Sequence, residues 1–278
     1  ILGGHSHELI KDVKEGENLL YGKDGNPVVI TQAGKDADNI GVLNLEFDEN
    51  GVITKVQNNV TPTKGFRRNL IMKYFSEKVL GKPEMVGTVK AADPEPANRL
   101  GAENPHADFV ADAMKEATGA EIAILGSANL RNTFEAGAIT SRDVSSIVPF
   151  KNGMVVAPLS EKTLVDALKF GAHSLVSAGT KPGILQVSGL NYKMNKAGEL
   201  LSADFVDKNG NKQALDINNP KEDKTFKVAL DTYYANGRDG FSMLSCMDKV
   251  EQTFEDDKDK MVMAKLKRMT QAGQPIEV

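Results

Sequence analysis

The sequence comprises 278 residues, 40% hydrophobic and 26% charged, with a net charge of −4 at pH 7, which allows one large domain or two modest ones. Lysine and arginine are dispersed among acidic residues rather than gathered into a stripe, which argues against a surface that binds a nucleic-acid polymer. No apolar run approaches the roughly 20 residues that a transmembrane segment needs, and no signal peptide is visible.

The amino-terminal part of the chain combines a histidine motif with strand signals. It opens with ILGGHSHELI, in which His5 and His7 are separated by one serine. Two neutral imidazoles that follow a strand can point into one open metal site, but the same pair can equally be exposed in a surface turn. Polar and apolar residues then alternate over residues 27–58, which predicts a β-hairpin with Asn50-Gly51 at its tip.

A helix and a loop are predicted next. The stretch FRRNLIMKYFSEKVLG, residues 66–81, repeats apolar residues at helical spacing and indicates a connecting helix. The stretch KAADPEPANR, residues 90–99, is rich in proline and alanine and predicts an extended loop.

Helices and strands alternate beyond this loop, with no internal repeat. Asn104 and Pro105 suit the start of a helix and Gly119 its end, so we expect a helix over 105–118. Further patterns predict, in order, a strand over 121–125, a helix over 160–176, a hairpin over 189–206, a strand over 224–234 and a closing amphipathic helix over 256–271. The pattern as a whole indicates an α+β fold.

Polar and aromatic residues that could hold a ligand occur in three stretches. Arg99 offers a planar guanidinium group that can meet phosphate or ribose oxygens, or it lies in a surface loop. In DTYYANGRDGF, the flanking glycines let a loop bend and present Asp239, whose carboxylate can accept hydrogen bonds from both hydroxyls of a ribose. Phe150 and Tyr233, taken alone, are typical of core residues.

Two smaller features have plain interpretations. The pair His106-x-Asp108 stands at a predicted helix start, where capping and surface polarity explain it better than a catalytic dyad. The single Cys246 excludes an internal disulfide framework and is interpreted as a packed thiol.

Taken together, these motifs resemble the 5'-nucleotidase family. The run LGGHSH, followed by PVVITQAG and IGVLNLEFDENG, is similar to the last segment of that family's metallophosphatase domain. The remainder is similar to its C-terminal substrate-binding domain. The resemblance implies a mixed-sheet α+β fold with a β remnant of the metallophosphatase domain over 1–60, a connecting helix over 61–85 and the substrate-binding domain over 86–278. Because the chain begins with Ile, we expect a fragment or a processed product.

The same resemblance assigns roles to individual residues. His5 and His7 would be ligands of a pair of divalent metals, zinc, manganese or similar, whose other ligands belong to a missing N-terminal metallophosphatase domain. We therefore expect the metal site to be unoccupied in this fragment. The implied substrate-binding residues are Arg99 and Arg131 near phosphate or ribose, Asn104 at the start of the domain's first helix, Phe150 and Tyr233 as two walls of a clamp around the base, Asn152 beside the base, and Asp239 at the ribose.

One stretch departs from the family pattern. The family usually has an asparagine and three glycines where this chain has Gly126-Ser127-Ala128-Asn129, which leaves the base preference open. Among possible substrates, 5'-nucleotides, UDP-sugars, NAD and 2',3'-cyclic nucleotides all remain.

The resemblance implies that the parent protein is a metal-dependent phosphohydrolase that removes phosphate from nucleotides. Its C-terminal domain would bind a nucleoside or nucleotide, and this fragment alone would be inactive. A periplasmic, cell-surface or secreted location is implied by the family only. Two alternatives are a non-catalytic nucleotide-binding module and a surface interaction protein in which the pocket is closed.

Overall fold

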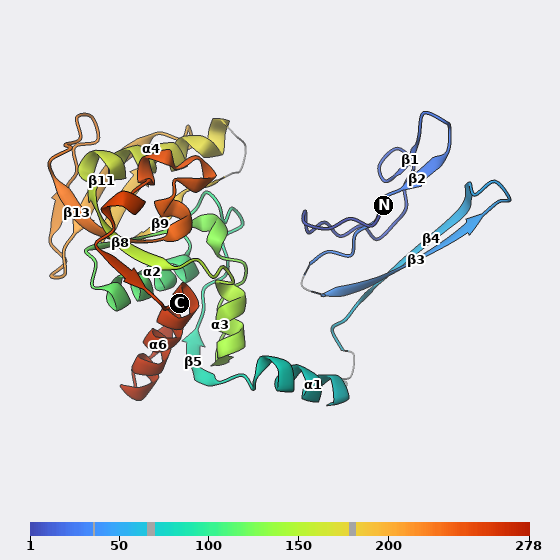
Figure 1. Cartoon of the computed structure of the whole chain (residues 1–278), viewed down its shortest axis with the longest axis horizontal. Coiled ribbons are helices and arrows are strands. Elements are labelled where there is room, and N and C mark those ends of the chain that lie inside the picture. The colour runs from blue at the N-terminus through green and yellow to red at the C-terminus, as the bar shows by residue number, and fades with distance from the viewer. Residues whose placement is uncertain (36, 66–69, 178–181) are drawn as a thin grey trace. The chain divides into compact units, whose positions relative to one another are not determined.

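The computed structural model describes residues 1–35, 37–65, 70–177 and 182–278 (Figure 1). The chain divides into two compact units, Ile1–Gly81 and Lys82–Val278, which are described separately. The predicted connecting helix lies partly outside the described residues, because positions 66–69 are not among them.

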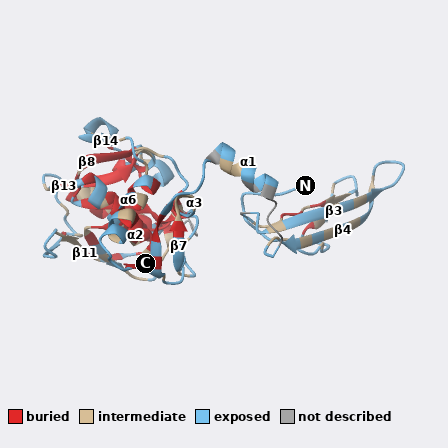
Figure 2. Cartoon of the chain, turned by 90° about the horizontal axis from the view of Figure 1, so that it is seen from below, coloured by how far each residue is buried: buried red, intermediate tan, exposed pale blue. Residues whose placement is uncertain are grey.

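The first unit consists of two small antiparallel pairs and one helix. Its elements are β1 (Leu19–Tyr21), β2 (Pro27–Val29), β3 (Asn39–Phe47), β4 (Ile53–Pro62) and α1 (Leu70–Leu80). β1 pairs with β2, and β3 pairs with β4. The predicted hairpin is present in β3 and β4, where Gly51 turns the chain with a φ of 77° that glycine adopts without strain. Most of this unit is exposed (Figure 2), although Val29 is buried.

The second unit contains three sheets with helices packed around them. Its elements are β5 (Met85–Ala91), α2 (Pro105–Thr118), β6 (Ile122–Gly126), β7 (Gly137–Thr140), α3 (Ser141–Ile147), β8 (Met154–Ser160), α4 (Glu161–Ser177), β9 (Leu185–Ser188), β10 (Leu190–Met194), β11 (Leu200–Val206), β12 (Lys212–Ala214), β13 (Thr225–Asp231), α5 (Thr232–Ala235), β14 (Gln252–Phe254), α6 (Lys258–Gln271) and β15 (Ile276–Glu277).

The central sheet has five strands in the order β14-β8-β13-β6-β9. β13 runs parallel to β6 and antiparallel to β8, so the sheet is mixed. The unit also contains two three-stranded sheets, β10-β11-β12 and β15-β5-β7. The predicted α+β class with a mixed sheet is confirmed.

Alternation along the central strands divides the core into two clusters. In β6, Ala123 and Leu125 belong to a cluster that also contains buried residues of α2, α3 and α6. Ile122 and Ile124 of the same strand belong to a second cluster, with buried residues of α4, β10 and β11. Because successive side chains of a strand point to opposite faces, helices can cover both faces of this sheet.

The caps of α2 are those predicted from the sequence. The Asn104 side chain accepts a hydrogen bond from the backbone N–H of His106 at 3.1 Å, and Gly119 ends the helix with a φ of 67°. The strand predicted over 224–234 is too long, because β13 ends at Asp231 and that residue caps α5 instead. The strands β5, β7, β8, β9, β12, β14 and β15 and the short helices α3 and α5 were not predicted.

His106 is not a surface residue, and that part of the prediction was wrong. It has no exposed surface, its Nε2 lies 2.9 Å from the carbonyl oxygen of Asp93, and its Nδ1 accepts from the N–H of Phe134 at 3.3 Å. These partners fit a neutral ring with the proton on Nε2. Burial lowers the pKa of His106. Cys246 is buried, as predicted, and burial raises its pKa to about 11.

Candidate functional site

Sheet topology brings three segments of the second unit to one edge. β13 and β6 are parallel, so both end at this edge, and β8 begins there because Met154 pairs with Asp231. The segments that leave or enter the sheet here are residues 127–131, 148–153 and 232–240. They contain five of the seven predicted substrate-binding residues.

Arg131 and Phe150 lie against each other at this edge. The backbone N–H of Arg131 donates to the carbonyl of Ile147 at 2.9 Å, which ties its segment to the end of α3. Its guanidinium carbon lies 5.1 Å from the centre of the Phe150 ring, a cation–π arrangement. Phe150 still exposes 36% of its surface, so part of this aromatic residue is free to meet a ligand.

Tyr233 and Asp239 form the second group. Tyr233 stands on α5 and is 39% exposed, and its hydroxyl donates to Oδ1 of Asp239 at 2.8 Å. This hydrogen bond is the main reason that the pKa of Tyr233 is raised. Asp239 has a φ of 54° and lies between Gly237 and Gly240, which also have positive φ. The tight loop thus exposes its carboxylate beside the ring.

Asn152 links the two groups. Its Nδ2 donates to Oδ2 of Asp231 at 3.3 Å, and the N–H of Thr232 donates to the carbonyl of Gly153 at 2.8 Å. The loop before β8 is therefore bonded to the start of α5. In the described part of the chain, the rings of Phe150 and Tyr233 make no aromatic contact with each other, and each remains partly exposed.

Arg99 is held by the backbone of the Arg131 segment, whereas Asn104 is bonded within α2 and to Gln186. Arg99 is half-buried, and its Nη1 donates to the carbonyl oxygen of Leu130 at 2.6 Å, next to Arg131 in sequence. Asn104 is 2% exposed and its side-chain oxygen caps α2. Arg99 thus lies close to the backbone of the Arg131 segment, whereas the oxygen of Asn104 is already engaged.

The departure from the family pattern has a packing consequence. A Cβ on Gly126 would lie 1.7 Å from the hydroxyl oxygen of Tyr234, so only glycine fits there. Ser127–Asn129 form a 3-10 helix, in which the Ser127 hydroxyl donates to the carbonyl of Ile184 at 2.8 Å. The stretch is therefore tied by a hydrogen bond to the segment that precedes β9.

Sequence reasoning missed four charged residues beneath the site: Lys151, Asp231, Lys258 and Asp259. An aspartate at the end of an apolar strand is a helix-cap signal and could have identified Asp231. A lysine at the start of an amphipathic helix gives no sign of burial, yet Lys258 is 0% exposed.

His5 and His7 lie in the first unit, on a turn with unusual backbone geometry. Their φ values are 69° and 62°, a region that residues other than glycine rarely adopt and that often marks function. Both side chains are exposed. No group of three or more histidine, cysteine, aspartate or glutamate side chains suited to a metal occurs among the described residues. Two imidazoles are too few to hold a metal pair, so the described residues do not fit that group by themselves.

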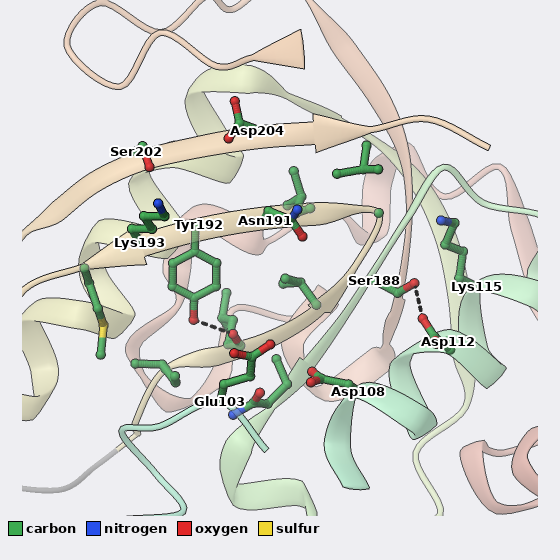
Figure 3. A pocket seen from close by; sticks show the side chains of 18 of the residues that line it. Glu103, Asp108, Asp112, Lys115, Ser188, Asn191, Tyr192, Lys193, Ser202 and Asp204 are labelled. Carbon is green, nitrogen blue, oxygen red and sulfur yellow. Dashed lines mark hydrogen bonds between the residues drawn. The ribbon is translucent and has the colours of Figure 1, made fainter. Parts of the chain in front are cut away.

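Away from these segments, a hollow of about 790 Å³ lies between α2 and strands β9 to β11 (Figure 3). None of the predicted substrate-binding residues lines it. Its charged lining consists of Glu103, Asp108, Asp112 and Asp204 with Lys115, Lys193 and Lys212. With four carboxylates against three lysines, it lacks the excess of positive charge that favours a phosphate ester.

One carboxyl in this pocket has a displaced pKa. Burial, followed by the nearby charges of Glu103 and Asp112, raises the pKa of Asp108 to about 7. Asp112 itself accepts a hydrogen bond from the Ser188 hydroxyl at 2.6 Å, as Figure 3 shows.

Comparisons with known proteins agree on one family. Residues 85–246 match the model described as 5'-nucleotidase, C-terminal domain. The chain is 29% identical over 262 residues to the trifunctional nucleotide phosphoesterase protein YfkN of Bacillus subtilis, covering 88% of this chain and 17% of that protein. It is 28% identical over 274 residues to an apyrase of Anopheles gambiae, covering 88% of this chain and 46% of the apyrase.

Among solved structures, a 5'-nucleotidase precursor from Thermus thermophilus matches with a TM-score of 0.71 and 21% identity, covering 97% of this chain and 56% of that one. This match shows the fold. The chain spans less than half the length of the two relatives named above. No helix in the described ranges is long and apolar enough to cross a membrane.

Proposed function

Because the chain belongs to the 5'-nucleotidase C-terminal domain family, we propose that it is the nucleotide-binding part of a hydrolase that removes phosphate from nucleotides. The observation that carries the proposal is the meeting of two exposed aromatic residues, an arginine and a carboxylate at one edge of the central sheet. The names of the relatives, a nucleotide phosphoesterase and an apyrase, support it.

Each group has a task suited to its chemistry. Phe150 and Tyr233 present partly exposed rings, on which a base can stack. The carboxylate of Asp239 accepts hydrogen bonds from ribose hydroxyls. Arg131, with Arg99 beside its segment, offers positive charge to a phosphate or donors to ribose oxygens.

The same proposal includes a pair of divalent metals, for which this chain supplies only two of the ligands. His5 and His7 would each contribute an imidazole, and the remaining ligands would have to come from elsewhere in the parent protein. The chain would accordingly bind substrate without hydrolysing it. We also propose, from the family resemblance, that the parent protein acts outside the cytoplasm.

Calorimetric titration of adenosine, AMP and UMP into the chain tests the binding function. We expect saturable binding that the double variant Phe150→Ala, Tyr233→Ala loses, because stacking contributes about 1–3 kcal/mol for each base contact. Leu201→Ala is the matched control, since Leu201 is 55% exposed on β11 and belongs to none of the site segments. If no ligand binds the wild-type chain, or if the double variant binds as tightly, the proposed site is wrong.

A further inference from the structure

Two adjacent residues at the start of α6 join the segments that carry the two rings. Lys258 and Asp259 are 0% and 3% exposed. Lysine and aspartate are almost never buried so fully unless they are paired. Each of them is paired with a different segment of the candidate site.

Lys258 holds the segment that carries Tyr233. Its Nζ lies 2.6 Å from Oδ2 of Asp231, which is itself 2% exposed. The other carboxylate oxygen of Asp231 accepts from the N–H of Tyr234 at 3.0 Å and so caps α5. The same Oδ2 also receives the hydrogen bond from Asn152. One buried carboxylate thus joins Lys258, the Tyr233 helix and the loop before β8.

Asp259 holds the segment that carries Phe150. Its Oδ2 accepts hydrogen bonds from Lys151, the residue after Phe150, and from the Ser145 hydroxyl of α3 at 2.7 Å. Burial acts to raise the pKa of Asp259, but the hydrogen bonds from Lys151 and Ser145 outweigh it and lower the pKa. Asp259 is therefore ionised and paired at neutral pH.

We propose that Lys258 and Asp259 are positioning residues, which fix the separation of the Phe150 and Tyr233 walls so that a base fits between them. The proposal rests on the proposed function, because it assigns these residues a part in nucleoside binding. A well-packed apolar pair in place of a buried ion pair is often as stable. A gain in stability is therefore a weak explanation for these buried charges. Ion pairs and hydrogen bonds have a preferred geometry, so they can hold two loops in a fixed alignment.

A double-mutant cycle separates positioning from general stability. Adenosine is titrated into the wild-type chain, Lys151→Met, Phe150→Ala and the combined variant. The Lys151 side chain is 52% exposed, so its replacement opens no cavity in the core; Asp259 loses its charged partner but keeps the hydrogen bond from Ser145. We expect Lys151→Met to weaken adenosine binding about fivefold in the wild-type background. In the Phe150→Ala background the same substitution should weaken binding less than about twofold. The two losses of affinity are then not additive, because Lys151 acts on binding through Phe150.

The buried pair is tested by rescue. We expect Lys258→Met to weaken binding by about tenfold or more, because it leaves Asp231 charged and unpaired in the core. Adding Asp231→Asn should recover most of the affinity, since asparagine carries no charge and its amide oxygen still caps α5, while its amide nitrogen can donate to the side-chain oxygen of Asn152 once the Asn152 amide has rotated. Should Lys258→Met fail to fold, the Lys151 cycle decides alone. Lys260→Met is the control on the same helix, because Lys260 pairs with Asp256 on the surface.

The outcomes distinguish this inference from the proposed function. Independent, additive losses for Lys151→Met and Phe150→Ala, or an unchanged affinity in Lys151→Met, overturn the positioning role while leaving the nucleoside site in place. A wild-type chain that binds no adenosine overturns the proposed function and the positioning role together.

Discussion

Tyr233 donates its hydroxyl hydrogen to Asp239 at 2.8 Å, so the ring proposed to stack on a base and the carboxylate proposed to hold a ribose form one unit. Because the bond engages one carboxylate oxygen, ribose hydroxyls would compete for it or use the second oxygen. In the proposed site, the pair would therefore couple recognition of the sugar to the orientation of the ring.

Ribose recognition can be tested at this pair. We expect the wild-type chain to bind adenosine more tightly than 2',3'-dideoxyadenosine by about 1.5–3 kcal/mol, the contribution of hydrogen bonds to a charged group. Asp239→Asn should reduce that preference while tolerating the left-handed backbone. Calorimetric titration measures both. Tyr233→Phe is the control, since it keeps the ring and should retain the preference; equal affinities for the two ligands in the wild-type chain would exclude a ribose contact.

Gly126 is predicted to be intolerant of any side chain. Gly126→Ala should destabilise the second unit by about 1–3 kcal/mol, because the new Cβ overlaps the Tyr234 hydroxyl. Urea unfolding monitored by circular dichroism measures the change. Gly153→Ala is the matched control, since its Cβ would meet only the Thr232 methyl at 3.7 Å. Unchanged stability in Gly126→Ala would show that Tyr234 moves aside freely.

Ionisation of Asp108 should lower the free energy of unfolding as the pH rises. Its pKa is about 7 in the folded chain against an ordinary 3.8, so between about pH 4 and pH 7 the folded state binds more protons than the unfolded state. Stability linked to this group is thus present below pH 4 and is lost as the pH rises through 7. We expect the difference in free energy of unfolding between Asp108→Asn and the wild type to favour the variant more at pH 7.5 than at pH 4.5. Urea unfolding of both proteins at the two pH values measures it.

The variant comparison matters because other groups titrate in the same range. The pKa of buried His106 is lowered, so its contribution to the free energy of unfolding increases as the pH rises, opposite to that of Asp108. His106 is common to both proteins and cancels in the difference. A difference that does not vary with pH would contradict the raised pKa of Asp108.

Metal addition should not make this chain an efficient phosphatase. His5 and His7 give two imidazoles, and catalytic zinc sites ordinarily use three protein ligands. We expect negligible phosphate release from AMP with added manganese or zinc, measured by a colorimetric phosphate assay. Heat-treated chain sets the background. Phosphate release that a chelator abolishes, and that His5→Ala, His7→Ala also abolishes, would show that the two histidines suffice.

Local signals predicted much of the second unit. Asn104, Pro105 and Gly119 fix the ends of α2 because caps depend on short-range geometry. Strands such as β8 were missed because their apolar runs carry no alternation when both faces are buried. The end of β13 was misplaced because a capping aspartate outweighs the strand preference of the tyrosines that follow it.

The residues proposed for the site were named from the sequence, and that assignment stays a prediction, whereas the charged residues that hold their segments were not predicted. The order of arginine, aromatic and aspartate residues can be read along the chain, and the resemblance assigned them roles. The pairs Lys258–Asp231 and Lys151–Asp259 join residues 27 and 108 positions apart. No local periodicity reports such pairings, because burial of a charge is decided by tertiary packing.

The pairing of β15 with β5 can form only late in the synthesis of the second unit. β15 pairs with β5, and the N–H of Val278 donates to the carbonyl of Ala91 at 3.0 Å. A ribosome makes β5 long before β15, so the nascent chain holds an open sheet edge until residue 278 has emerged. Unpaired strand edges favour association with other chains. A polypeptide that stops before residue 276, and so lacks β15, should therefore be prone to aggregate.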